Sequence, residues 1–161
     1  MLSTVFCFLG ILLSSCLLST VYTGIIFIFI LAPLRTFTGG YHANSYAKCF
    51  LISNVLYAIL LIINNYVLNN MHIIIWWTLL LIFSLYISKR APIINKAQPI
   101  KREKQEICKR NTRYVLVFDA IFIFSLLFLN RELMNMAILC IGLVAVLMLI
   151  ADKPIYKKEV F

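Results

Sequence analysis

Apolar residues along this 161-residue chain come in long runs that short polar stretches separate. The first run covers residues 1–34, which as a single helix would be about 50 Å long, against a hydrocarbon core of ~30 Å. It therefore predicts either one steeply tilted helix or two short helices, and small polar residues near Ser19, Thr20 and Gly24 favour a break. Later runs of membrane-spanning character lie at residues 49–68, 73–88, 114–129 and 133–151.

The polar stretches between the runs carry turn-forming residues. Residues 35–48 follow Pro33 and contain the pair Gly39-Gly40, so they are expected to form a turn-rich segment. Residues 89–113 are expected to form a loop, and a turn around Asn130-Arg131-Glu132 should join the last two runs. The pattern predicts an all-α, polytopic transmembrane helical bundle of about five or six membrane helices with a basic cytoplasmic loop. The whole chain, residues 1–161, is expected to be a single membrane-embedded domain.

Composition excludes a soluble protein. The chain is 63% hydrophobic with a mean hydropathy of +0.96, whereas a soluble domain is about half apolar. The net charge is +9, and nine of the fifteen basic residues fall within residues 89–113. In a membrane protein such a cluster marks the cytoplasmic side and contact with anionic lipid rather than nucleic acid.

The same charge rule orients the other segments. Residues 35–48 should also lie inside, and the first residues lie outside if the first run is one helix or inside if it is two. Aromatic belts agree: Trp76 and Trp77 fall near the expected outer interface. Tyrosines fall near the inner interface, namely Tyr46, Tyr86, Tyr114 and Tyr156.

Cysteine and histidine usage limits the possible chemistry. Five cysteines, an odd number without paired spacing, argue against a disulfide framework and a structural zinc site. The two histidines, His42 and His72, are expected on opposite sides of the bilayer, which argues against a membrane metalloenzyme. We therefore predict no metal and no cofactor.

His42 and Cys49 are the candidate reactive pair. A cysteine thiol becomes a useful nucleophile when a base or cation favours the thiolate, and histidine is the usual base. In one unbroken helix the two residues would lie about 10.5 Å apart along the axis, so the helix carrying Cys49 must begin after His42. Asn44 or Ser45 would then cap that helix. Spacing alone is also typical of an interfacial histidine and an unrelated apolar cysteine.

Two motifs carry a family resemblance. The string Arg35-x4-Gly40-x-His42-x6-Cys49, which opens a membrane span, resembles the core motif of the accessory gene regulator B (AgrB) family. Ala91-Pro92 and Gln98-Pro99-Ile100-Lys101, followed by basic residues, resemble that family's cytoplasmic loop. The order of spans matches from about Ile25 to the tail.

The resemblance implies a function. AgrB proteins are cysteine endopeptidases of the bacterial cytoplasmic membrane that remove the C-terminal tail of an AgrD-like propeptide through a thioester, so that an autoinducing thiolactone or lactone can close for quorum sensing. The active site is expected on the cytoplasmic side, the partners are the propeptide and the lipid bilayer, and the chain can form a homodimer. Family members usually carry a further amphipathic N-terminal segment before the first apolar run, and this sequence begins without it, so either the chain is a short member or an upstream start is absent from the sequence.

The resemblance also assigns roles to residues. Cys49 matches the nucleophile and His42 the general base, whereas the supporting positions are Arg35, Gly39 and Gly40. Basic residues that the family needs for processing fall at Lys101, Arg102 and Lys104, which are candidates for substrate binding.

Other readings remain open beside this one. Cys108, next to Lys109 and Arg110, is a competing thiol that lacks a nearby histidine in sequence. Asp119, inside an apolar run, could support catalysis by orienting His42, pair with Arg113, or line a wet cleft. From another class, the chain could be a non-enzymatic small membrane transporter or assembly partner.

Overall fold

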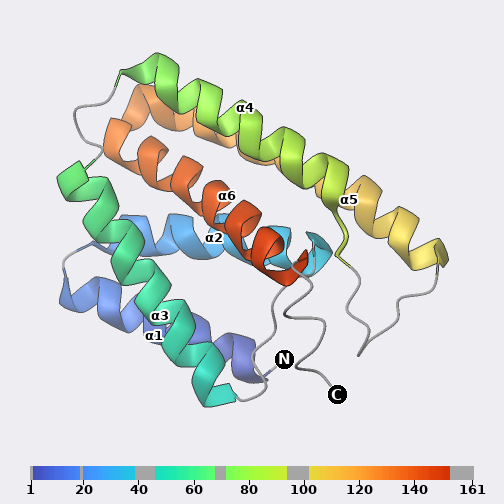
Figure 1. Ribbon diagram of the computed structural model, residues 1–161. Coiled ribbons are helices and arrows are strands. Elements are labelled where there is room, and N and C mark those ends of the chain that lie inside the picture. Colours follow the sequence, from blue (N-terminus) through green and yellow to red (C-terminus); the bar gives the residue numbers. More distant parts are fainter. Residues whose placement is uncertain (1, 19, 39–45, 68–71, 94–101, 153–161) are drawn as a thin grey trace.

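The computed structural model describes residues 2–18, 20–38, 46–67, 72–93 and 102–152. Six α-helices and one π-helical segment account for nearly all of these residues, which confirms the all-α fold class (Figure 1). In chain order the elements are α1 (Leu2–Leu17), α2 (Val21–Thr38), α3 (Tyr46–Ile62), η1 (Ile63–Val67), α4 (Ile73–Arg90), α5 (Arg102–Leu129) and α6 (Arg131–Asp152).

The first apolar run is two helices, as the small polar residues predicted. The break lies between α1 and α2, and Gly24 is inside α2. The N–H of Thr20 donates to the carbonyl of Ser15 (2.8 Å), and the Thr20 hydroxyl lies 3.1 Å from the hydroxyl of Tyr57 on α3. Thr23 bonds the same Tyr57 hydroxyl at 3.1 Å. The polar residues near the break therefore join the first three helices.

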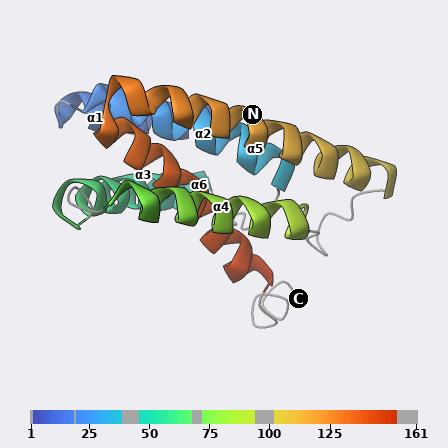
Figure 2. The ribbon, with the colours of Figure 1, turned by 90° about the horizontal axis from the view of Figure 1, so that it is seen from above.

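α6 crosses the middle of the molecule and packs against α2, α4 and α5 (Figures 1 and 2). Its first three turns supply much of the core, because the following α6 side chains are buried: Met134, Met136, Ala137, Ile138, Cys140 and Ile141. Gly142 lets α4 come close, since a Cβ atom there would lie 2.8 Å from the ring of Phe83. We call α2, α4, α5 and α6 the central bundle.

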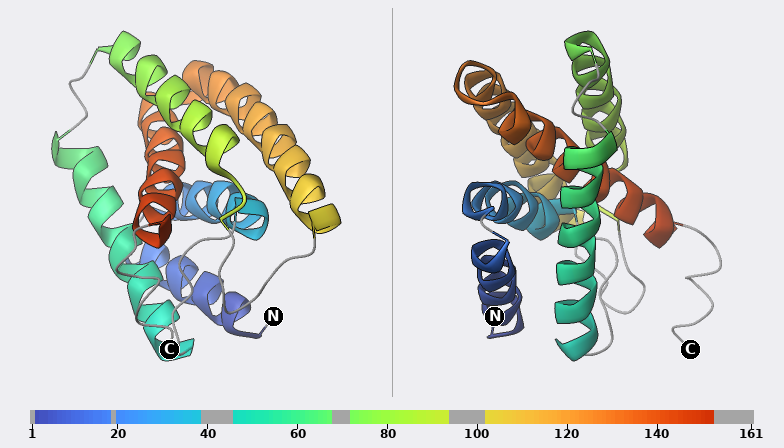
Figure 3. Two further views of the ribbon diagram at one scale, coloured as in Figure 1. Left: turned by 45° about the vertical axis from the view of Figure 1, so that its right-hand side comes forward. Right: turned by 90° about the vertical axis from the view of Figure 1, so that its left-hand side faces the viewer.

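α1 and α3 form a second unit, which we call the peripheral pair. The two helices pack along each other on one side of the central bundle (Figure 3). Large apolar side chains on both are exposed, including Leu13 and Leu17 of α1 and Leu51 and Val55 of α3. Such exposure suits contact with lipid rather than water.

The helices alternate in direction, so their ends gather at two ends of the molecule (Figures 1 and 3). One end holds the last turns of α2, α4 and α6 and the first turns of α1, α3 and α5, and we call it the basic end. Four helices, α2, α4, α5 and α6, are long and apolar enough to cross a membrane, whereas α1 and α3 are shorter apolar helices. The chain is therefore a polytopic membrane protein, and its first residues lie at the basic end, as the two-helix alternative predicted.

The expected loop at residues 89–113 is largely wrong. α4 continues through Lys89 and Arg90, and α5 begins at Arg102. At 28 residues, α5 is about 42 Å long and exceeds a hydrocarbon core of ~30 Å. The charged start of α5 extends past the other helices instead of forming a loop (Figure 2). Its exposed basic side chains are Lys104, Lys109, Arg110 and Arg113.

At the opposite end of the molecule, the expectation that Trp76 lies at the membrane interface is wrong. This side chain is 0% exposed and packs into the core, so it does not belong to an interfacial belt, whereas Trp77 is partly exposed. The turn at Asn130 is as expected: its side-chain oxygen accepts a hydrogen bond from the N–H of Glu132 at 2.8 Å and caps α6.

Candidate functional site at the basic end

The two motif segments identified in the sequence follow the ends of α2 and α4, and these two helix ends lie side by side. α2 ends at Thr38, directly before the glycine pair, and α4 ends at Arg90, directly before the cis bond of Ala91-Pro92. The N–H of Ile93 donates to the carbonyl of Thr38 at 3.0 Å. The chain that leads to His42 and the chain that leads to Lys101 therefore leave the bundle from one point (Figure 1).

Cys49 is the fourth residue of α3 and lies in its first turn, at the basic end. Backbone N–H groups in a first helical turn lack helical partners and create a positive potential, which favours a thiolate. His42, Gly39 and Gly40 lie outside the described residues, as does the side chain of Cys49. The pairing of His42 with Cys49 stays a prediction.

Contacts with α1 fix the start of α3. The ring of Phe50, next to Cys49, lies over Gly10 so closely that a Cβ atom on Gly10 would collide with it. One turn further on, the Ser14 hydroxyl donates to the side-chain oxygen of Asn54 at 3.5 Å, and the Asn54 amide donates to the carbonyl of Phe50 at 2.9 Å. α1 therefore serves as the support against which the Cys49 turn is seated. Sequence reasoning missed this support, although a glycine within an apolar helix was a signal for close packing.

Arg35 lies in the last turn of α2 and is partly buried. The expectation that residues 35–38 belong to a turn is wrong, because α2 continues to Thr38. The Thr36 and Thr38 hydroxyls each donate to a backbone carbonyl one turn earlier at 2.8 Å, which satisfies these polar groups inside the helix. Arg35 therefore lies on a helix, about one turn before α2 ends at Thr38.

The predicted substrate-binding residues lie at or before the start of α5. Lys101 is outside the described residues, Arg102 opens the helix, and Lys104 is exposed. Cys108, the competing thiol, is partly buried two turns into α5. The exposed cations Lys104, Lys109 and Arg110 are therefore presented by a helix rather than by a loop.

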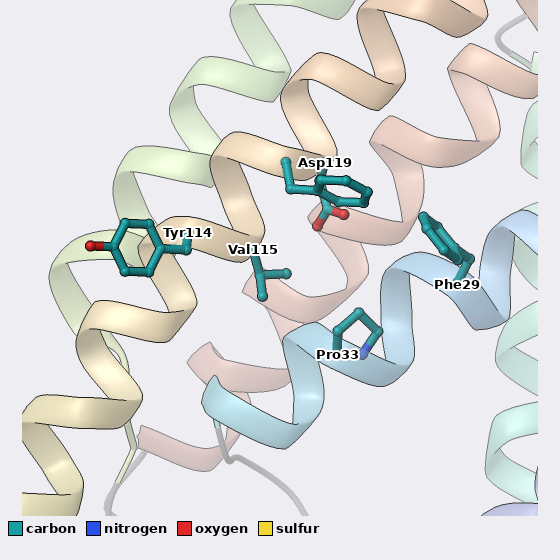
Figure 4. A pocket seen from close by; sticks show the side chains of 6 residues that line it. Phe29, Pro33, Tyr114, Val115 and Asp119 are labelled. Atoms are coloured by element: carbon teal, nitrogen blue, oxygen red, sulfur yellow. The ribbon is translucent and has the colours of Figure 1, made fainter.

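Asp119 lies deeper in the central bundle and is 1% exposed. Neither of its carboxylate oxygens has a hydrogen-bond partner among the described residues, so no pairing with the exposed Arg113 is seen. Asp119 is one of the residues that line a cavity of about 460 Å³ between α2 and α5 (Figure 4), although both of its carboxylate oxygens are buried. That Asp119 lines a wet cleft stays a prediction, because the walls of this cavity are mostly apolar side chains. Its role toward His42 stays a prediction.

No group of three or more His, Cys, Asp or Glu side chains able to hold a metal occurs among the described residues. His72, exposed just before α4, lies at the opposite end from Arg90.

A family model described as AgrB, accessory gene regulator B, matches residues 1–150. The chain belongs to this family. The match begins earlier than the resemblance suggested, at residue 1 instead of about Ile25, so α1 is part of the family fold.

One curated relative is AgrB-like protein 1 of Clostridium perfringens (strain 13 / Type A). It is 27% identical over 127 residues, which is 78% of this chain and 64% of the relative. This chain therefore spans less than two thirds of the length of that AgrB-like protein. No solved structure matches the chain.

Proposed function

We propose that this AgrB family member is a membrane cysteine endopeptidase of peptide quorum sensing. Its substrate would be an AgrD-like precursor with an amphipathic leader, a central cysteine or serine, and an acidic C-terminal tail. The observation that carries the proposal is the position of Cys49 in the first turn of α3, at the end where the two motif segments meet through Thr38 and Ile93.

Binding would use the two physical properties of this end. The leader would lie on the membrane surface with its apolar face in the lipid. The acidic tail would be attracted to the basic start of α5, where Lys104 and Lys109 are exposed. Arg102 and Lys101 are proposed to belong to the same surface. These two contacts would hold the bond to be cut near the start of α3.

The chemistry would proceed in two steps. His42 takes the thiol proton of Cys49, and the thiolate attacks the scissile carbonyl carbon. The C–N bond breaks, His42 returns the proton to the departing amine, and the peptide remains as a thioester on Cys49. The central thiol or hydroxyl of the precursor then attacks this thioester, which closes a thiolactone or lactone ring and regenerates the Cys49 thiol. Arg35, Gly39 and Gly40 are proposed to support this site, on the cytoplasmic side of the bacterial membrane.

The test is cleavage of a precursor co-expressed with the full chain, followed by mass spectrometry of the released tail. Cys49→Ala and His42→Ala are each expected to abolish the tail product. Cys108→Ala is the matched control, because it removes a thiol at the same end and should leave cleavage intact. Cleavage that survives in either of the first two variants would overturn the assignment, and loss of cleavage in Cys108→Ala alone would move the nucleophile to α5.

The non-enzymatic alternative gains little from the structure. A transport path usually contains several ionisable side chains within the membrane. Asp119 is the only buried charged side chain among the described residues. One buried carboxylate is fewer than such a path usually contains.

A further inference from the structure

The cavity between α2 and α5 presents almost only apolar surface. Both carboxylate oxygens of Asp119 are buried behind its wall, and the Tyr114 hydroxyl points away from it (Figure 4). Residues of the two helices line it: Phe29, Pro33, Tyr114, Val115, Phe118 and Asp119. A polar group placed inside would lose its hydrogen bonds to water and gain none, which is costly. The cavity therefore suits a guest without polar groups.

The cavity lies on the lipid-facing side of the bundle. Phe29, Tyr114 and Phe118 are all exposed, and α2 and α5 are both long and apolar enough to cross a membrane. Exposed side chains on such spans meet hydrocarbon. The ring of Phe29 lies 6.0 Å from that of Phe118 and 5.1 Å from that of Phe122, measured between centroids. The apolar wall thus continues one turn deeper, and a lipid chain can enter from the side.

Polar donors follow on α5 toward the basic end. Arg110 and Asn111 lie four positions before the lining residues Tyr114 and Val115, so helical spacing places them on the same stripe of α5. Arg110 is exposed and Asn111 partly exposed. A guanidinium and an amide NH₂ group donate hydrogen bonds, and phosphate oxygens accept them. The stripe therefore combines phosphate donors with an apolar cavity that begins about 6 Å deeper along the helix.

This arrangement fits a phospholipid better than a peptide. The backbone N–H and C=O groups of a peptide inside the cavity would stay unsatisfied, whereas an acyl chain has no such groups. Amphipathic peptides that lie on anionic membranes carry Lys and Arg on their polar faces, which Arg110 would repel. The phosphate of a lipid is instead attracted by Arg110, and its chains already lie at the depth of Phe118.

We propose that the α2–α5 cavity holds one acyl chain of an anionic phospholipid, whose phosphate contacts Arg110 and Asn111. Such a lipid touches α2 and α5 at once. It joins the helix that ends before the glycine pair to the helix that presents the basic side chains. The lipid site does not depend on the peptidase chemistry, because none of the residues that would touch the lipid takes part in the proposed cleavage steps.

Fluorescence quenching can measure contact with an acyl chain at the cavity. The full chain carrying Phe118→Trp is reconstituted in phosphatidylcholine vesicles with increasing fractions of phosphatidylglycerol brominated in its acyl chains, or of brominated phosphatidylcholine. The unsubstituted chain supplies the signal of Trp76 and Trp77, which is subtracted. Phosphatidylglycerol is expected to bind beside the reporter about fivefold more tightly than phosphatidylcholine. Phe128→Trp, an exposed position nearer the other end of α5, should show no preference.

Two variants of the Phe118→Trp chain separate a lipid site from general attraction to the basic end. Arg110→Gln should remove the preference for phosphatidylglycerol. Arg113→Gln is the matched control: it removes the same charge from an exposed position of the same helix, but about 200° around α5 from Val115. It should change the preference by less than about twofold. Val115→Phe narrows the cavity and should reduce quenching although Arg110 is intact.

Equal binding of the two lipids beside the Phe118→Trp reporter would overturn the proposal, as would equal losses in Arg110→Gln and Arg113→Gln. Glycerol phosphate, which is the headgroup without chains, should leave the quenching unchanged, and relief by it would show a phosphate site without an acyl chain. Relief by an amphipathic peptide would assign the cavity to a peptide instead. If circular dichroism shows that Val115→Phe does not fold, the comparison of Phe118→Trp with Phe128→Trp still decides.

Discussion

The central bundle and the peripheral pair differ in how deeply their side chains are buried. α6 and its neighbours α2, α4 and α5 contain most of the buried side chains, whereas α3, which carries Cys49, packs mainly on α1. The proposed nucleophile is therefore held by the less buried part of the protein. Stability and cleavage should respond to different substitutions, and four variants test this division.

The largest effect on stability is expected from Met136→Ala in α6. Met136 is fully buried at the centre of the core, and truncation of such a side chain costs roughly 2–5 kcal/mol because the space left behind refills only partly. Unfolding followed by circular dichroism in detergent should show the loss. The equivalent truncation Leu51→Ala on the exposed face of α3 should change the unfolding free energy far less. Similar losses at both positions would mean that the two units are not distinct.

Gly142→Val should also lower the unfolding free energy, because it adds side-chain volume between α4 and α6 instead of removing it. The new side chain would meet the Phe83 ring, 2.8 Å from the Cβ position, and overpacking of this kind costs about 1–3 kcal/mol. The double variant Gly142→Val with Phe83→Ala should recover part of the unfolding free energy. No recovery would show that α4 and α6 meet elsewhere.

Gly10→Ala should act on cleavage more than on stability. The added Cβ collides with the Phe50 ring beside Cys49, and a shift of about 1 Å at a reacting group can cost on the order of a hundredfold in rate. We expect the cleavage rate to fall by about ten- to a hundredfold, with a smaller change in unfolding than Gly142→Val causes. Phe50→Leu in the same chain should restore much of the rate. An unchanged rate in Gly10→Ala would show that α1 does not seat the Cys49 turn.

Tyr57→Phe should have the smallest effect. It removes a hydroxyl that lies 3.1 Å from those of both Thr20 and Thr23, and a hydrogen bond of this kind contributes about 0.5–1.5 kcal/mol. Because the hydroxyl joins the peripheral pair to α2, the loss should appear in unfolding, with cleavage reduced only modestly. Thr78→Val is the control, since its hydroxyl bonds only within α4, to the Ile75 carbonyl.

The hydrophobic pattern was enough to predict the fold, because a membrane span must be long and apolar. It located the break after α1, the later helices and the turn at Asn130. It failed where polar residues remain helical. Thr36 and Thr38 satisfy their hydroxyls within α2, and the charged start of α5 is a helix outside the hydrocarbon core. Residue type alone does not distinguish such segments from loops.

The candidate site was less accessible to sequence reasoning. Spacing and family resemblance singled out Cys49, and the structure adds that its turn opens α3 at the basic end. The support from Gly10 and the cavity around Asp119 depend on which helices touch, and a single sequence does not contain that information. Trp76 illustrates the same limit, since a tryptophan near a span end is typical of an interface and here lies in the core.

The central position of α6 has a consequence for how the protein is made. Among the described helices it is the last to leave the ribosome, yet α2, α4 and α5 all pack on it. Until it enters the bilayer, those three helices have no common partner, and their inward faces meet lipid or insertion factors. Quality-control proteases would meet an unfinished bundle for most of synthesis, whereas α3 would already have α1 to pack against.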